Sequence, residues 1–160
     1  MKNMNIFKTG LIAVGLLVLI TSCSSDDSTS VDEEYPTINL AETYPETCTE
    51  LQRGKTITAK ITVDDNVELG SVSLDIHNDF DHHNHSTEIE ECSLDPQKEP
   101  DNPFKYIISI PIPEGQDHYV IEKDIDIPAD VDPGDYHFMI RVTDKAGWQT
   151  MKGLSIKIKE

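Results

Sequence analysis

Hydrophobic and polar residues alternate with a period of two over most of the chain from residue 35 onward. In the clearest stretch, 56–63, the apolar positions 57, 59, 61 and 63 alternate with threonines and a lysine. Successive side chains of a β-strand point to opposite faces, so this pattern predicts strands with one buried and one polar face. Since no stretch shows the 3.6-residue period of an amphipathic helix, the chain is predicted to be all-β.

The number of alternating stretches indicates the kind of all-β fold. Further strands are predicted at 71–77, 106–110, 119–127, 136–143 and 154–159, with a short one near 37–40. About seven short strands separated by turn residues predict a β-sandwich. The sequences Pro133-Gly134-Asp135-Tyr136 and Thr143-Asp144-Lys145-Ala146-Gly147-Trp148 resemble the last hairpin of immunoglobulin-like modules on bacterial surfaces. The resemblance implies an immunoglobulin-like β-sandwich.

The N-terminal segment has the features of a bacterial lipoprotein signal. Lys2 and Lys8 precede the apolar run 11–20, which has about half the length that a membrane-spanning helix needs. Ile20-Thr21-Ser22-Cys23 resembles a lipobox, which implies cleavage before Cys23 and a diacylglycerol thioether on its sulfur. An uncleaved N-terminal anchor helix is the alternative interpretation.

These features divide the chain into three parts. We expect a signal peptide at 1–22, a lipidated cysteine with a flexible acidic tether at 23–34, and the sandwich domain at 35–160. The acidic residues after Cys23 also resemble the surface-export signal of Bacteroidota lipoproteins. Together the resemblances imply an outer-membrane lipoprotein, anchored in the membrane through Cys23 and exposed at the cell surface.

Charge and motif content restrict the classes of function. The formal net charge is −17, from 30 acidic and 13 basic residues in 160. An acidic surface of this kind repels nucleic acid and attracts cations, so nucleic acid is not an expected partner. The sequence also lacks a Gly-x-Ser-x-Gly motif, a phosphate-binding loop and a dinucleotide-binding fingerprint. We therefore predict that the protein has no enzymatic activity.

The densest group of metal-binding side chains lies in the stretch 75–85, Asp-Ile-His-Asn-Asp-Phe-Asp-His-His-Asn-His. Imidazole is a good ligand for zinc, copper and nickel, and a carboxylate can complete the coordination shell. We expect a zinc or copper site with His82, His83 and His85 as the main ligands. The supporting ligands are predicted to be His77 and Asp79 or Asp81.

A further histidine, His137, is a candidate ligand from a distant part of the chain. In an immunoglobulin-like sheet the third and sixth strands are neighbours, which would place His77 and His137 on one outward face. This depends on a strand register that the sequence does not fix, so two unrelated surface histidines remain the alternative. His118, just before the fifth strand, is expected to be a bystander.

Calcium is the less favoured metal. The aspartate-rich stretches 64–66, 124–126 and 130–135 could supply oxygen ligands, but they do not fit the twelve-residue loop of an EF-hand. The stretch 64–66 is first of all a turn, because aspartate and asparagine side chains bond readily to nearby backbone.

Cys48 and Cys92 remain once Cys23 carries the lipid. An even pair of cysteines in an oxidising compartment predicts a disulfide, with two free thiols or thiolate metal ligands as the alternatives. A disulfide would tie down the far end of the connection 78–103. This connection carries the histidines and is predicted to be an insertion in the sandwich, since long loops in compact domains are usually functional or disordered.

The lipobox, the stretch 74–86 with its Phe-Asp-His-His-Asn-His-Ser end, and the terminal hairpin together resemble one family. This family is the group of Bacteroidota lipoproteins classed as domain of unknown function 4625. The resemblance implies the fold and the location of the protein. It implies no activity.

Three functions are compatible with the sequence. The first is a surface lipoprotein that binds zinc or copper for capture or for handover to an outer-membrane uptake receptor. The second is a non-enzymatic interaction module that contains no metal and serves a surface protein complex or glycan capture. The third is a metallohydrolase, which needs an open coordination position and a general base such as Glu88, Glu90 or Glu91.

Overall fold

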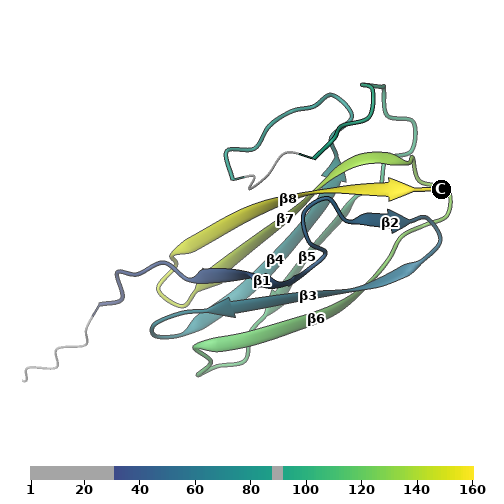
Figure 1. Ribbon diagram of the computed structural model, residues 1–160. Coiled ribbons are helices and arrows are strands. Elements are labelled where there is room, and N and C mark those ends of the chain that lie inside the picture. The colour runs from purple at the N-terminus through teal and green to yellow at the C-terminus, as the bar shows by residue number, and fades with distance from the viewer. Residues whose placement is uncertain (1–30, 88–91) are drawn as a thin grey trace, which may run out of the picture. The chain divides into compact units, whose positions relative to one another are not determined.

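The computed structural model describes residues 31–87 and 92–160, which form eight strands in two sheets (Figure 1). The strands are β1 (Thr37–Tyr44), β2 (Glu50–Gln52), β3 (Thr56–Asp64), β4 (Leu69–Asn78), β5 (Tyr106–Pro111), β6 (His118–Asp126), β7 (Gly134–Asp144) and β8 (Gln149–Lys159). The described residues contain no helix that could cross a bilayer. The predicted signal peptide 1–22 and the lipidation site Cys23 lie outside the described residues.

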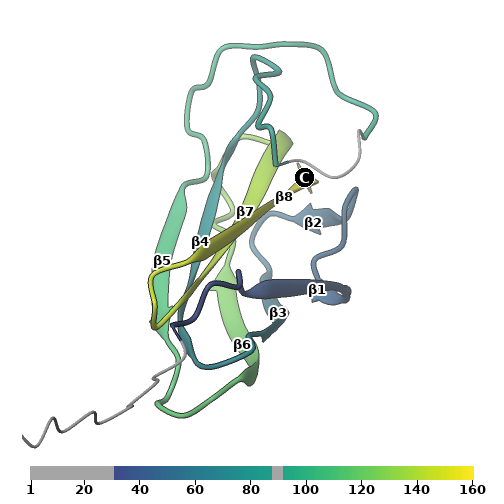
Figure 2. The same ribbon diagram turned by 90° about the vertical axis from the view of Figure 1, so that its left-hand side faces the viewer.

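The two sheets differ in size. One has three strands in the order β1-β3-β6, and the other has five in the order β2-β8-β7-β4-β5. Neighbouring strands are antiparallel except for β2 and β8, which are parallel. Figure 2 shows the sheets as two layers. The all-β sandwich prediction is confirmed. The sequence missed β2, because three residues are too few to show an alternating pattern.

The predicted alternation produces the core between the layers. Ala59, Ile61 and Val63 of β3 are fully buried, and they belong to the same apolar cluster as Leu74 and Phe138 of the five-stranded sheet. Apolar side chains alternate on each strand, so each sheet turns one face inward and leaves the other for polar groups. The outward face of the five-stranded sheet is therefore available for a site.

A hydrogen-bonded tyrosine marks the start of β7. The hydroxyl of Tyr136 donates to the carbonyl of Asp132 at 2.7 Å and accepts from the backbone N–H of Phe104 at 3.1 Å. Burial of the phenol raises the pKa of Tyr136 to about 12. A tyrosine bonded back to the chain a few residues upstream is typical of immunoglobulin-like sandwiches. The contact favours the immunoglobulin-like prediction, which stays a prediction.

β4 and β7 are neighbours in the five-stranded sheet, and their register pairs His77 directly with His137. The preceding and following residues, Ile76 and Phe138, point into the core, so the two histidines share the outward face. The predicted pairing of the third and sixth alternating strands is confirmed. His137 is nevertheless only 1% exposed, because the loop after β4 covers it.

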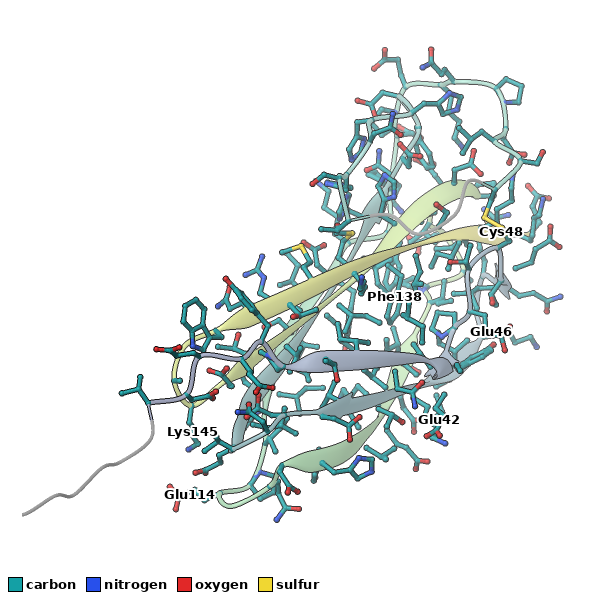
Figure 3. All side chains as sticks on the ribbon, turned by 60° about the vertical axis from the view of Figure 1, so that its left-hand side comes forward. Glu42, Glu46, Cys48, Glu114, Phe138 and Lys145 are labelled. Atoms are coloured by element: carbon teal, nitrogen blue, oxygen red, sulfur yellow. A yellow bond between two sulfur atoms is a disulfide. The ribbon has the colours of Figure 1, made fainter. Side chains whose placement is uncertain are left out.

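The long connection between β4 and β5 is fixed to the sandwich at several points. Phe80 is buried with its ring centroid 5.3 Å from that of Tyr136, and the backbone N–H of Gly153 donates to Thr87 at 3.0 Å. The predicted disulfide between Cys48 and Cys92 is present. Figure 3 shows Cys48 at the end of the domain from which this loop extends. The loop is thus held close to the sheet that carries His77 and His137.

Candidate metal centre

Four histidines meet on the outward face of the five-stranded sheet. His77 comes from β4 and His137 from β7, while His83 and His85 come from the loop that follows β4. Each offers one ring nitrogen, and these four atoms lie within 4.8 Å of one another. The Nε2 atoms of His77 and His85 are 3.1 Å apart. In a tetrahedral zinc site, two coordinating nitrogens lie about 3.3 Å apart, so the spacing suits a shared ion.

The four imidazole rings are nearly equidistant. All six distances between ring centroids fall between 4.7 and 5.6 Å. In a square arrangement the two diagonals would be about 1.4 times the sides, as expected for a tetragonal copper(II) site. The observed longest distance is only about 1.2 times the shortest. The rings therefore surround a common point in a tetrahedral rather than a planar arrangement.

The four histidines differ in how far they are exposed to solvent. The side chain of His137 is 1% exposed, whereas those of His77 and His83 are 24% and 37% exposed. A hollow of about 410 Å³ is lined in part by His77 and His85. A second hollow, of about 500 Å³, is lined in part by His77 and His83. An ion could therefore reach the four rings from solvent.

Two aspartates hold histidine rings in a fixed orientation. Oδ1 of Asp75 lies 3.0 Å from Nδ1 of His77, and Oδ1 of Asp81 lies 2.6 Å from Nδ1 of His83. Each carboxylate accepts the proton of Nδ1, so the ring nitrogen with the lone pair is Nε2. The hydrogen bond from His83 lowers the pKa of Asp81, so this acceptor stays ionised. Such carboxylate–histidine pairs are common around metal sites and increase the basicity of the ligand.

A backbone contact orients His137, the most deeply buried of the four histidines. Nε2 of His137 donates to the carbonyl of His83 at 3.1 Å, so the neutral ring carries its lone pair on Nδ1. The buried carboxylate of Asp79 lies 3.3 Å from Nε2 of His137 and 3.4 Å from Nδ1 of His83. Asp79 and Asp81 thus contact the protonated nitrogens of two histidines. This geometry suits them as partners of the ligands better than as ligands.

The chain also matches a known sequence family. The family model described as Domain of unknown function (DUF4625) matches residues 21–159. The chain belongs to this family. The match includes the four histidines that meet in the candidate metal centre and the aspartates that orient His77 and His83.

Two solved structures resemble the DUF4625 domain at low identity. One is a Niemann-Pick type C2 protein from Japanese carpenter ant, with 11% identity, a TM-score of 0.39, and coverage of 79% of this chain and 90% of that chain. The other is a family 123 glycoside hydrolase from Clostridium perfringens, with 13% identity, a TM-score of 0.41, and coverage of 78% of this chain and 27% of that chain. Neither similarity is close enough to carry an argument. The curated proteins include no match to the chain.

His82, which the sequence predicts as a main metal ligand, lies apart from the four histidines of the candidate site. Nε2 of His82 is 2.9 Å from the carbonyl of Asp95, and His82 has a left-handed backbone φ of 58°. This conformation turns the ring away from its neighbours at 83 and 85. Histidine is among the residues that tolerate it. The prediction that His82, His83 and His85 act together needs correction: among the described residues, His77 and His137 join His83 and His85 instead.

The remaining histidine of the DUF4625 domain, His118, lies outside the group. Its Nδ1 is 2.6 Å from Oδ1 of Asp64, and this hydrogen bond raises the pKa of His118. The positioning role of the aspartates at 75 and 81 is not among the predictions made from the sequence. The signal was present as a repeated Asp-x-His spacing, which in β4 places Asp75 and His77 on one face of the strand.

Proposed function

We propose that this protein binds a late first-row transition metal, with zinc favoured, through His77, His83, His85 and His137. The observation that carries the proposal is the near-equal spacing of the four rings, 4.7 to 5.6 Å between centroids. Zinc has no geometric preference of its own from d-electrons and adopts a tetrahedral site readily, whereas copper(II) prefers a tetragonal one. Imidazole is a ligand that both metals accept, so geometry favours zinc.

The number of ligands argues for binding without catalysis. Four protein nitrogens fill a tetrahedral shell and leave no position for a water or a substrate. A metallohydrolase needs such an open position. Its predicted general bases, Glu88, Glu90 and Glu91, lie outside the described residues. We therefore propose a non-enzymatic role.

The access to the site supports capture or handover of the metal. Two hollows lead to the rings, and only His137 is fully covered. A purely structural zinc is usually enclosed, while a metal that is passed on must be reachable by the next ligand. We propose that the protein is an outer-membrane lipoprotein, anchored through Cys23, that presents the metal to a surface receptor. Imidazoles bind metal only when neutral, so binding should fall as the pH drops through about 6.

The test is a zinc titration of the full-length chain, purified in detergent, by calorimetry. We expect one zinc per chain with sub-micromolar affinity at pH 7.5. His83→Ala and His137→Ala should each weaken binding by at least about 100-fold, because one of four ligands is lost. His82→Ala is the matched control, since it removes the same side chain from the adjacent position, and it should leave the affinity nearly unchanged.

Two results would contradict the proposal. Equal losses in His82→Ala and His83→Ala would mean that the loop binds zinc without the observed geometry. Weak binding in the unaltered chain would remove the metal site altogether. Cobalt(II) provides a second readout, because a tetrahedral shell gives intense visible absorption that a six-coordinate shell does not.

A second candidate function is an interaction module without metal. It is favoured by Ile107, which is 77% exposed on β5 at the edge of the five-stranded sheet. Ile107 lies beside Met139 and Met151 in the lining of the hollow of about 410 Å³. Exposed apolar side chains on an edge strand are suited to contact with another protein. Loss of partner capture in Ile107→Thr, with retention in His83→Ala, would favour this function.

A further inference from the structure

Three aspartates meet at the opposite end of the sheet from the histidines. Asp32 precedes β1, Asp65 lies in the turn between β3 and β4, and Asp144 ends β7. Each offers one carboxylate oxygen, and these oxygens lie within 4.8 Å of one another. Asp144 and His137 are seven residues apart on β7, so the two groups are separated by about 23 Å. This acidic group is therefore independent of the histidine site.

Two of these carboxylates use only one oxygen to stabilise their turns. Oδ2 of Asp65 accepts from the backbone N–H groups of Val67 and Glu68 at 2.9 and 2.7 Å. Oδ1 of Asp144 accepts from those of Gly147 and Trp148 at 2.6 and 2.8 Å. The turns thus fix both carboxylates in place, and each keeps a second oxygen for another contact.

The second oxygens are buried. Oδ1 of Asp65 and Oδ2 of Asp144 have no hydrogen-bond partner within residues 31–87 and 92–160, and Asp144 as a whole is only 4% exposed. A buried acceptor without a donor is unfavourable, and two ionised carboxylates close together repel each other. A cation between them would remove both penalties.

We infer that Asp32, Asp65 and Asp144 form a calcium site. Ca²⁺ binds six to eight oxygens at about 2.4 Å, so oxygens on opposite sides of one ion are about 4.8 Å apart. The three ligand atoms lie within 4.8 Å of one another, so all of them are close enough to share one ion. The site consists of carboxylate oxygens and contains no imidazole, so it suits a hard cation rather than zinc or copper. Water or backbone carbonyls would complete the shell.

The calcium site joins the segment before β1 to the domain. In Figures 1 and 2 this segment lies beside the turn between β7 and β8. The indole Nε1 of Trp148 donates to the carbonyl of Asp32 at 2.9 Å, and the ring of Tyr35 packs 4.8 Å from that of Trp148. Calcium would link Asp32 to two turns of the sandwich. Bound calcium would therefore strengthen the attachment of the end of the N-terminal segment to the domain, in addition to these two contacts.

The experiment uses terbium(III) as a luminescent substitute for calcium in the full-length chain, purified in detergent. Trp148 is the single tryptophan of the sequence and adjoins the site, so its excitation should sensitise terbium emission. Calcium should displace terbium with a dissociation constant of about 0.1 to 1 mM, the range of extracellular calcium modules. Calcium should also change the fluorescence of Trp148 as the contact with Asp32 becomes permanent.

Two variants with equal charge changes test the location. Asp32→Asn should weaken calcium binding by at least about tenfold, because an ionised ligand is lost. Glu33→Gln, at the next position, should have no effect. Asp65→Asn is a second variant, and its amide oxygen can still accept the two turn hydrogen bonds. His83→Ala should bind calcium normally.

Sensitised emission that calcium does not displace would overturn the inference. So would equal effects of Asp32→Asn and Glu33→Gln, because the acids would then act only as a diffuse negative charge. Calcium binding that is lost in His83→Ala would place the ion at the histidines instead. Since the zinc and calcium sites are read by different metals and different variants, either proposal can fail while the other holds.

Discussion

Oδ1 of Asp75 lies 3.0 Å from Nδ1 of His77, two residues further along the same strand. Side chains at positions i and i+2 of a strand share a face, so the strand itself brings the carboxylate to the ring. With Nδ1 of His77 bonded to Asp75, its Nε2 faces the other histidines of the group and lies 3.1 Å from Nε2 of His85. The aspartate thereby selects which nitrogen of His77 can bind a metal.

The first prediction concerns this aspartate. Asp75→Ala should lower zinc affinity by about 10 to 100-fold, because the ring loses its orientation and part of its basicity. The side chain of Asp75 is 43% exposed, so the fold should tolerate the change. Calorimetric titration measures the effect. Asp101→Ala, an exposed acid in the same long connection, is the charge control; a comparable loss in that variant would mean that only net charge matters.

The second prediction concerns the disulfide. Cys48→Ser/Cys92→Ser should lower the free energy of unfolding by roughly 4 kcal/mol, since the bridge closes a loop of 44 residues. Zinc affinity should also fall, because the loop that carries His83 and His85 becomes freer and must be ordered on binding. Urea denaturation and zinc titration measure the two effects. Unchanged zinc affinity in the double variant would mean that the non-covalent contacts of the loop, such as those of Phe80 and Thr87, are enough to order it.

The third prediction concerns the glycine at the start of β7. Gly134 has a φ of +136°, and a Cβ atom there would lie 3.0 Å from Cε1 of Phe80. Gly134→Ala should destabilise the domain by about 1–3 kcal/mol through backbone strain. It should also weaken zinc binding, because a shift of Phe80 moves the adjoining Asp79 and Asp81.

Gly115→Ala separates the two effects of that substitution. Gly115 also has a positive φ, +76°, but a Cβ there would meet nothing within 4 Å. This control should lose stability in urea denaturation while keeping full zinc affinity. If Gly134→Ala also kept full zinc affinity, the position of Phe80 would not matter to the site.

The sandwich could be predicted because its signal is local. Alternation over eight or more residues, as in β3, fixes both the strand and the face that enters the core. The same periodicity places His83 and His85 on one side of an extended segment and so indicates that they act together. The pairing of β4 with β7 followed from the order of strands in the immunoglobulin-like pattern.

The rest of the site depends on contacts between distant residues. The direction of His82 is set by the carbonyl of Asp95, thirteen residues away, which the sequence does not reveal. Burial of His137 requires the loop to fold back over β7. Likewise, no local pattern joins Asp32, Asp65 and Asp144, which are brought together only by the ends of three chain segments. Sequence patterns identify the ligand types, whereas tertiary contacts decide which of them meet.

A partly buried lysine, Lys157, anchors the far side of the loop. Nζ of Lys157 lies 2.6 Å from Oδ1 of Asp95 and 2.9 Å from Oδ1 of Asp135. Burial alone would lower the pKa of Lys157, but the hydrogen bonds to Asp95 and Asp135 outweigh it and raise the pKa above the usual value. The hydrogen bond from Lys157 in turn lowers the pKa of Asp95. The contact therefore stabilises the charged forms of both groups.

The fourth prediction is the pH dependence of this contact. The lowered pKa of Asp95 adds stability above about pH 4, which is lost as the pH falls through the folded value. The raised pKa of Lys157 adds stability below about pH 10, which is lost as the pH rises through the folded value. Lys157→Met should therefore cost most near pH 7, about 3–5 kcal/mol, because the buried carboxylate of Asp135 loses its ion-pair partner. The cost should shrink below pH 4.

Urea denaturation at pH 3, 5 and 7 measures the difference between Lys157→Met and the unaltered chain. Lys159→Met is the matched control, because Lys159 is 42% exposed and its contact with Glu50 at 3.4 Å is a surface ion pair. That variant should cost less than about 1 kcal/mol at every pH. A loss in Lys157→Met that is the same at pH 3 and pH 7 would mean that its methylene chain, rather than its charge, holds the loop against β8.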